Sequence, residues 1–132
     1  MTADAHPVTA AGLKAVAAFR KLFEHGSAGE WAAEQRSLPV FDYGEHVRNL
    51  RRVLQAHGFV FSFDWPGWRE DAQRYLTDPT LIQSASLEDV RRLFTTIVRA
   101  DRFCEGSLAS DIDSGFVLAL LRRVEVLAEV RK

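Results

Sequence analysis

The stretch that decides the fold is residues 86–124, which read SLEDVRRLFTTIVRADRFCEGSLASDIDSGFVLALLRRV. Its first half repeats apolar residues at spacings of three and four, which is typical of the buried face of an α-helix. Ser86 followed by Asp89 has the form of a capping box, so the helix should begin at Ser86. We expect it to end near Arg102.

The same stretch ends in a second helix, which we predict at residues 114–130. Its apolar face is broad, so we expect it to be the central helix of the core. Asp113 or Ser114 is a natural N-cap for it. Between the two helices the backbone must turn, and Gly106 is the residue suited to that turn.

The rest of the chain shows the same helical periodicity in shorter segments. Further helices are predicted at residues 8–25, 30–36, 42–57 and 68–76. Thr9 is the expected N-cap of the first, and the second is centred on Trp31. The predicted fold class is therefore all-α, an irregular bundle of five to six helices with one extended aromatic connector.

That connector is GFVFSFDWPGW, residues 58–68. Its alternating phenylalanines are typical of a strand, but no second alternating run exists to pair with it. We expect it to be extended and buried against helices. Six aromatic residues are expected to join the core there: Phe59, Phe61, Phe63, Trp65, Trp68 and Tyr75. Asp64 either caps a helix that starts at Pro66 or projects into a groove.

Composition limits the structural and functional classes to which this protein can belong. The 132 residues fit one domain, residues 1–132, with 47% hydrophobic and 27% charged residues and a net charge of −1. Such a charge gives no overall attraction to nucleic acid or anionic membrane. The one cysteine excludes an intramolecular disulfide, and no apolar run or signal sequence indicates a membrane segment. We expect a cytoplasmic protein with no membrane partner.

Two segments, residues 58–79 and 85–124, together resemble a bacterial family, domain-of-unknown-function family 6508. The resemblance rests on FDW with a second Trp three positions later, on RxDRFxEGxLA, and on the glycine before the LLRR helix. It implies no activity, cofactor or partner. Residues 39–132 form the family-like core, and residues 1–38 are a helical region without a recognisable match. The pair Asp111 and Asp113 departs from the family, where one acid is expected.

Metal binding is not predicted. His46 and His57 share a helix face but lie eleven residues apart, which is about 16 Å along a helix and too far for one ion. There is no HExxH motif, and Asp111-x-Asp113 lacks the terminal glutamate of a calcium loop. We expect no metal and no cofactor.

Catalysis is not assigned to any residue. Cys104 follows a helix end and precedes Glu105, which both disfavour a thiolate, so we expect a half-buried structural cysteine. Asp101 and Glu105 are expected to pair with Arg99 or Arg102. One alternative stays open, a carboxylate-based hydrolase that uses Glu105, Asp111 and Asp113.

Nucleic-acid binding is a second alternative, because arginine outnumbers lysine 14 to 3 and recurs in clusters. Acids accompany each cluster, however, and the last helix is too apolar to lie exposed in a groove.

The sequence favours a binding or interaction module that acts on a protein partner or as a homodimer. Its candidate surface lies where the connector approaches the turn after residue 99. The candidate binding residues are Asp64, Trp65, Trp68, Arg99, Arg102 and Glu105.

Overall fold

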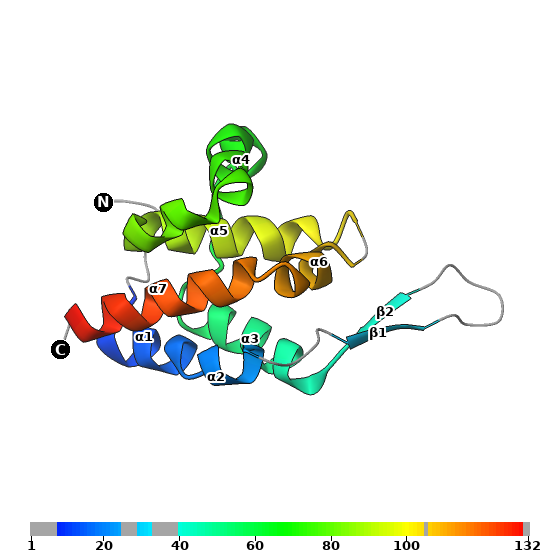
Figure 1. Cartoon of the computed structure of the whole chain (residues 1–132), viewed down its shortest axis with the longest axis horizontal. Coiled ribbons are helices and arrows are strands. Elements are labelled where there is room, and N and C mark those ends of the chain that lie inside the picture. The colour runs from blue at the N-terminus through cyan, green and yellow to red at the C-terminus, as the bar shows by residue number, and fades with distance from the viewer. Residues whose placement is uncertain (1–7, 25–28, 33–39, 105, 131–132) are drawn as a thin grey trace.

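The computed structural model describes residues 8–24, 29–32, 40–104 and 106–130 (Figure 1). In chain order the elements are α1 (Ala10–Ala17), α2 (Arg20–Phe23), β1 (Gly29–Ala32), β2 (Val40–Tyr43), α3 (Glu45–Ala56), the 3-10 helix η1 (Pro66–Trp68), α4 (Arg69–Thr77), the 3-10 helix η2 (Pro79–Ser84), α5 (Leu87–Ala100), α6 (Ser107–Asp113) and α7 (Phe116–Val130). Apart from one small hairpin, the described residues are helical or in connections. The predicted all-α class is confirmed.

Helix α7 lies at the centre of the bundle. It packs against α1, α2, α5, α6 and η2, and in Figure 1 it runs between α1 and α5. Leu120, Leu121 and Val124 are fully buried on it. The prediction that the last helix is the central one is confirmed, because its apolar face is broad enough to be covered from several sides.

Helix α5 begins as its sequence predicts. Ser86 Oγ accepts a hydrogen bond from the Asp89 N–H at 3.1 Å, which satisfies one free donor of the first turn. The helix ends at Ala100, two residues before the predicted end. Two polar side chains, Arg91 and Thr95, are buried on it beside the expected apolar ones.

The described residues contain seven α-helices, more than the five to six predicted. The predicted helix over residues 8–25 is two helices, because the chain tightens after α1 and Phe19 N–H bonds to Val16 three residues back. Thr9 caps α1 as predicted, accepting from Gly12 N–H at 3.0 Å. The other additional helix is α6, which lies where a turn was expected.

The predicted helix over residues 30–36 is wrong where the structure describes it, and its remainder lies outside the described residues. Strand β1 pairs antiparallel with β2, from Gly29 opposite Tyr43 to Ala32 opposite Val40. The hairpin extends from one end of the helical body in Figure 1. Because β2 ends at Tyr43, α3 starts at Glu45, three residues later than predicted.

The connector has an irregular backbone that ends in η1 and pairs with no strand among the described residues, and side chains of α5 satisfy part of that backbone. Thr95 Oγ1 donates to the Phe59 carbonyl at 3.1 Å and accepts from the Phe61 N–H at 3.2 Å. Arg91 Nε donates to the carbonyl of Gly58 at 2.8 Å, just where a φ of +79° turns the chain out of α3. Side chains of one helix therefore fix the course of the connector.

Candidate functional site

The connector approaches the turn after α5 through two aromatic rings. The centroids of Trp65 and Phe103 lie 6.0 Å apart, with the rings tilted by 37°. Trp65 is half-buried, whereas Phe103 is 81% exposed. Neighbouring Cys104 is also exposed, so the expectation that it is half-buried is wrong. We name the surface of Trp65, Phe103, Arg99 and Arg102 the corner.

The polar residues predicted for this surface have different environments. Asp64 Oδ1 accepts from the Gly67 N–H at 3.1 Å, so Asp64 caps η1. Arg99 is half-buried and Arg102 exposed, and neither forms an ion pair within the part of the chain that the structure describes. Glu105 lies outside the described residues, so its role stays a prediction.

Most of the connector aromatics lie at the surface of the core and not inside it. Phe59 is fully buried, with its ring edge-to-face on Phe94 at 5.9 Å. The other five are half-buried, and of these only Trp68 and Tyr75 pack against the core, so the expectation that all six join it is met only in part: Phe61, Phe63, Trp65, Trp68 and Tyr75. The connector rises from the core after Phe59, and this leaves its later rings only partly covered.

Four of these residues, which we name the aromatic row, form a chain of ring contacts. Phe61 stacks on Phe63 at 5.0 Å, Phe63 meets Trp68 at 6.2 Å, and Trp68 stacks on Tyr75 at 6.4 Å. Arginines of α5 lie over two of the rings: Arg91 is 4.2 Å from the Phe61 centroid and Arg92 is 5.9 Å from the Trp68 centroid. The row links the connector to α4.

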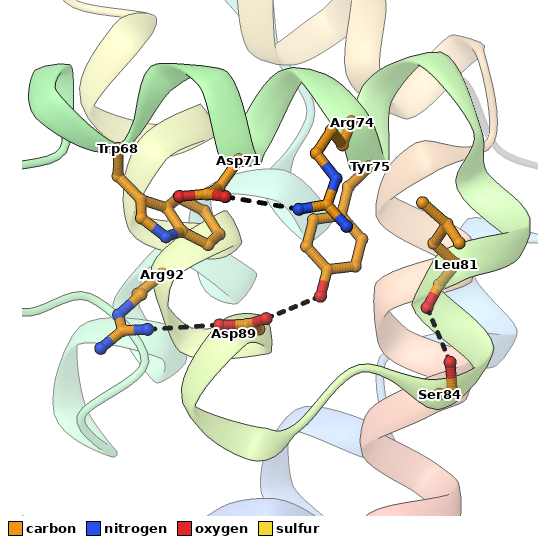
Figure 2. Close-up of a pocket in the computed structure, with 8 residues that line it drawn as sticks. All are labelled: Trp68, Asp71, Arg74, Tyr75, Leu81, Ser84, Asp89 and Arg92. Carbon is orange, nitrogen blue, oxygen red and sulfur yellow. Dashed lines mark hydrogen bonds and ion pairs between the residues drawn. The ribbon is translucent and has the colours of Figure 1, made fainter.

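At the far end of the aromatic row lies a pocket of about 410 Å³ between α4, η2 and α5, which we name the α4–α5 pocket. Its lining residues are Trp68, Asp71, Arg74, Tyr75, Leu81, Ser84, Asp89 and Arg92. Figure 2 shows Trp68, at the end of η1, and Tyr75, on α4, pointing toward the first turn of α5, where Asp89 lies. Only Trp68 of these residues is among the binding residues predicted from the sequence.

The floor of this pocket is a hydrogen-bonded set. Tyr75 Oη donates to Asp89 Oδ2 at 2.6 Å, and Arg92 Nη1 donates to Asp89 Oδ1 at 3.3 Å (Figure 2). Burial and the Asp89 carboxylate raise the pKa of Tyr75 to about 12, so the hydroxyl keeps its proton. The Asp71–Arg74 pair at the rim is longer, 3.6 Å, and mostly exposed.

A buried carboxylate holds the corner together from inside. Asp101 Oδ1 accepts from Tyr43 Oη at 2.7 Å and from the Leu108 N–H at 3.1 Å, while Tyr43 Oη accepts from the Ala109 N–H at 3.2 Å. Arg51 Nη1 lies 4.0 Å from Asp101 Oδ2. The expectation that Asp101 pairs with an arginine of its own segment is therefore wrong. Asp101 instead caps α6 and ties it to the end of β2.

The carboxylates of the hydrolase alternative do not come together among the described residues. Asp111 and Asp113 lie two positions apart on α6, so they face different sides of the helix. Asp111 is half-buried and Asp113 exposed, and Glu105 lies outside the described residues. This geometry gives no support to that alternative.

Asp111 should nevertheless make stability depend on pH. Burial, and then the negative charge of Asp101, raise its pKa from 3.8 to about 6. Between these two pH values the folded state holds a proton that the unfolded state has released. The stability that protonated Asp111 contributes is therefore lost as pH rises from about 4 to 6. We expect Asp111→Asn to raise the free energy of unfolding by about 1 kcal/mol at pH 7.5, after discounting for its partial exposure, and by nothing at pH 3.5.

Urea unfolding of both proteins at the two pH values measures this difference. Asp113→Asn is the matched control and should change stability at neither pH, because Asp113 is exposed. An equal effect of Asp111→Asn at both pH values would contradict the pKa assignment.

Within the described ranges, no three His, Cys, Asp or Glu side chains lie close enough together to hold a metal ion. None of the described helices has the length and apolar character needed to cross a membrane.

A family model described as a family of unknown function, DUF6508, matches residues 8–130. The match includes residues 8–38, where the sequence motifs indicated none. No curated protein and no solved structure matches the chain.

Proposed function

This chain belongs to the DUF6508 family, and we propose that it is a binding module without catalytic activity that recognises a protein segment at the corner. The segment supplies an apolar side chain for Trp65 and Phe103 and a carboxylate for Arg99 or Arg102. The single observation that carries the proposal is Phe103, a phenylalanine that is 81% exposed and lies against a half-buried tryptophan.

An exposed phenylalanine that lies against a half-buried tryptophan is an expected feature of a protein interface. Aromatic residues and arginine are enriched at the centres of interfaces, and they lose most of their contact with water on binding. Phe103 lies at the outer end of a turn that Asp101 holds from inside. The ring is thus presented on a fixed backbone, which reduces the entropy lost on binding.

The charge of the segment follows from the arginines that form no ion pair with another described residue. Arg92 pairs with Glu88 and Asp89, and Arg74 pairs with Asp71. Arg99 and Arg102 have no such partner among the described residues. A carboxylate of the segment gives their guanidinium groups an acceptor, in bidentate geometry if one arginine takes both oxygens.

A nucleic acid is a poorer fit to the neighbouring aromatic row. Stacking of bases on aromatic rings needs a surface that also attracts phosphates. The arginines beside the aromatic row are accompanied by acids: Arg91 pairs with Glu88 at 3.1 Å, and Arg92 pairs with Glu88 and Asp89. With a net charge of −1, the chain as a whole does not attract polyanions.

We expect a random peptide library displayed on phage to yield peptides in which an apolar residue lies next to Asp or Glu. Phe103→Ser should raise the Kd of such a peptide at least about tenfold, measured by fluorescence polarisation, because a central aromatic contact is lost. Thermal unfolding should be unchanged, since the Phe103 ring is mostly in water. Val130→Ser is the matched control, at an apolar residue that is 78% exposed on α7.

Three results would contradict the proposal: no enriched peptide, equal binding by Phe103→Ser, or a dimer in solution that Phe103→Ser converts to a monomer. Labelled random DNA and RNA are tested in the same assay. Tighter, salt-dependent binding of either would favour the nucleic-acid alternative.

A further inference from the structure

The geometry points to a second binding site: we propose that the α4–α5 pocket binds a free α-amino acid with an apolar or aromatic side chain. This inference does not rest on the proposed function, because the pocket lies at the far end of the aromatic row and shares no residue with the corner.

The walls of the pocket suit a small, partly apolar ligand. A volume of about 410 Å³ lies within the range of small-molecule sites, and two stacked aromatic residues, Trp68 and Tyr75, form one wall. Leu81, exposed on η2, contributes an apolar side chain at the opposite end in Figure 2. An apolar or aromatic side chain of the ligand that lies between them removes water from Trp68, Tyr75 and Leu81.

The charges of the lining select a ligand with no net charge. Two carboxylates, Asp71 and Asp89, balance two guanidinium groups, Arg74 and Arg92. A purely cationic or anionic ligand would meet a repelling charge for each attracting one. A zwitterion can pair with both kinds of group at once.

The rim pair is the place where the zwitterion binds. Arg74 Nη1 lies 3.6 Å from Asp71 Oδ1, and the side chains are 74% and 54% exposed, so the pair contributes little stability and opens readily. The carboxylate and ammonium of an α-amino acid are separated by one carbon atom. They can therefore replace the two partners together, with the carboxylate on Arg74 and the ammonium on Asp71.

The floor remains in place when the rim opens. Asp89 is held by Tyr75 Oη at 2.6 Å and by Arg92 Nη1 at 3.3 Å, and Arg92 also covers the Trp68 ring. These contacts fix the direction of both aromatic side chains. The pocket therefore combines a rigid aromatic wall with a charged pair that can rearrange. Such a site can bind the ammonium and carboxylate common to all α-amino acids and accept different side chains.

Isothermal titration calorimetry with the standard amino acids tests the proposal. We expect saturable binding of members such as L-phenylalanine or L-leucine, and a loss of at least about tenfold for N-acetyl-L-phenylalanine amide, which lacks both charges. Arg74→Gln and Asp71→Asn should each weaken binding by a similar factor. Arg69→Gln and Glu70→Gln, on the same helix but outside the pocket, should not.

Both pocket substitutions are at exposed side chains, so the variants should fold. The proposal is overturned if no standard amino acid binds saturably, if the blocked amide binds as tightly as the free amino acid, or if the two pocket variants bind like the wild type. Phe103→Ser should leave amino-acid binding unchanged, which separates this site from the corner.

Discussion

Replacing Phe59 by alanine lowers the free energy of unfolding by about 4 kcal/mol, the largest effect that we expect in the connector. The Phe59 side chain is fully buried and packs edge-to-face on Phe94. Its carbonyl also accepts a hydrogen bond from Thr95, so collapse of the backbone into the vacated space is restricted. The lost apolar burial and the remaining cavity therefore add together.

Urea unfolding followed by far-ultraviolet circular dichroism measures the change. Phe61→Ala is the matched control and should cost about 1 kcal/mol, because its ring is already partly in water. Equal losses for the two variants would mean that Phe59 does not anchor the connector.

The second large effect is expected at Asp101. Asp101→Ala should lower the free energy of unfolding by about 3 kcal/mol, because it leaves Tyr43 Oη and the Leu108 N–H buried without their acceptor. Arg51 loses its nearby carboxylate as well. The start of α6 then lacks its cap, and the corner loses its attachment to β2.

A double-mutant cycle with Tyr43→Phe isolates this contact, and the two changes should be coupled by about 1 kcal/mol or more. Asp113→Ala, at an exposed position on α6, should change stability by less than about 0.5 kcal/mol. Additive effects of Asp101→Ala and Tyr43→Phe would show that the hydrogen bond contributes nothing.

These expectations divide the turn after α5 into two parts. Asp101 is buried and holds the turn through hydrogen bonds to residues before and after it. Phe103 is two residues away and faces solvent. A variant of Asp101 should therefore lose stability, whereas a variant of Phe103 should keep stability and lose binding.

Helices α5 and α7 could be predicted because the information for each is local. A capping serine, repeats of apolar residues at spacings of three and four, and a broad apolar face all lie within one segment. The cap that Asp64 gives to η1 is local as well, spanning three residues. Such features depend little on the rest of the chain.

The hairpin and the cap of α6 depend on distant pairing. Strand β1 has four residues and no signal of its own, since it is defined by its partner β2. Helix α6 is capped by Asp101, and that carboxylate is fixed by Tyr43, 58 positions earlier. No spacing rule connects residues so far apart.

The connector shows a third limit. Alternation predicts which aromatic side chains share a side of an extended segment, and Phe61 does stack on Phe63. Alternation does not predict how deeply each ring is buried. Phe59 is fully buried, whereas the aromatic rings that follow it are half-buried. The sequence does not reveal the α4–α5 pocket for a related reason: the capping-box pattern accounts for Asp89, whereas its carboxylate accepts a hydrogen bond from Tyr75 of α4.

Mapping a selected peptide on the ¹⁵N-labelled protein by NMR tests whether the corner binds a protein segment. We predict that the largest amide shifts fall in residues 63–68 and 99–104 and that the indole N–H of Trp65 moves with them. Phe103→Ser should abolish these shifts while the rest of the spectrum is retained. Shifts concentrated on α7 or on the β1–β2 hairpin, with the corner unchanged, would contradict binding at the corner.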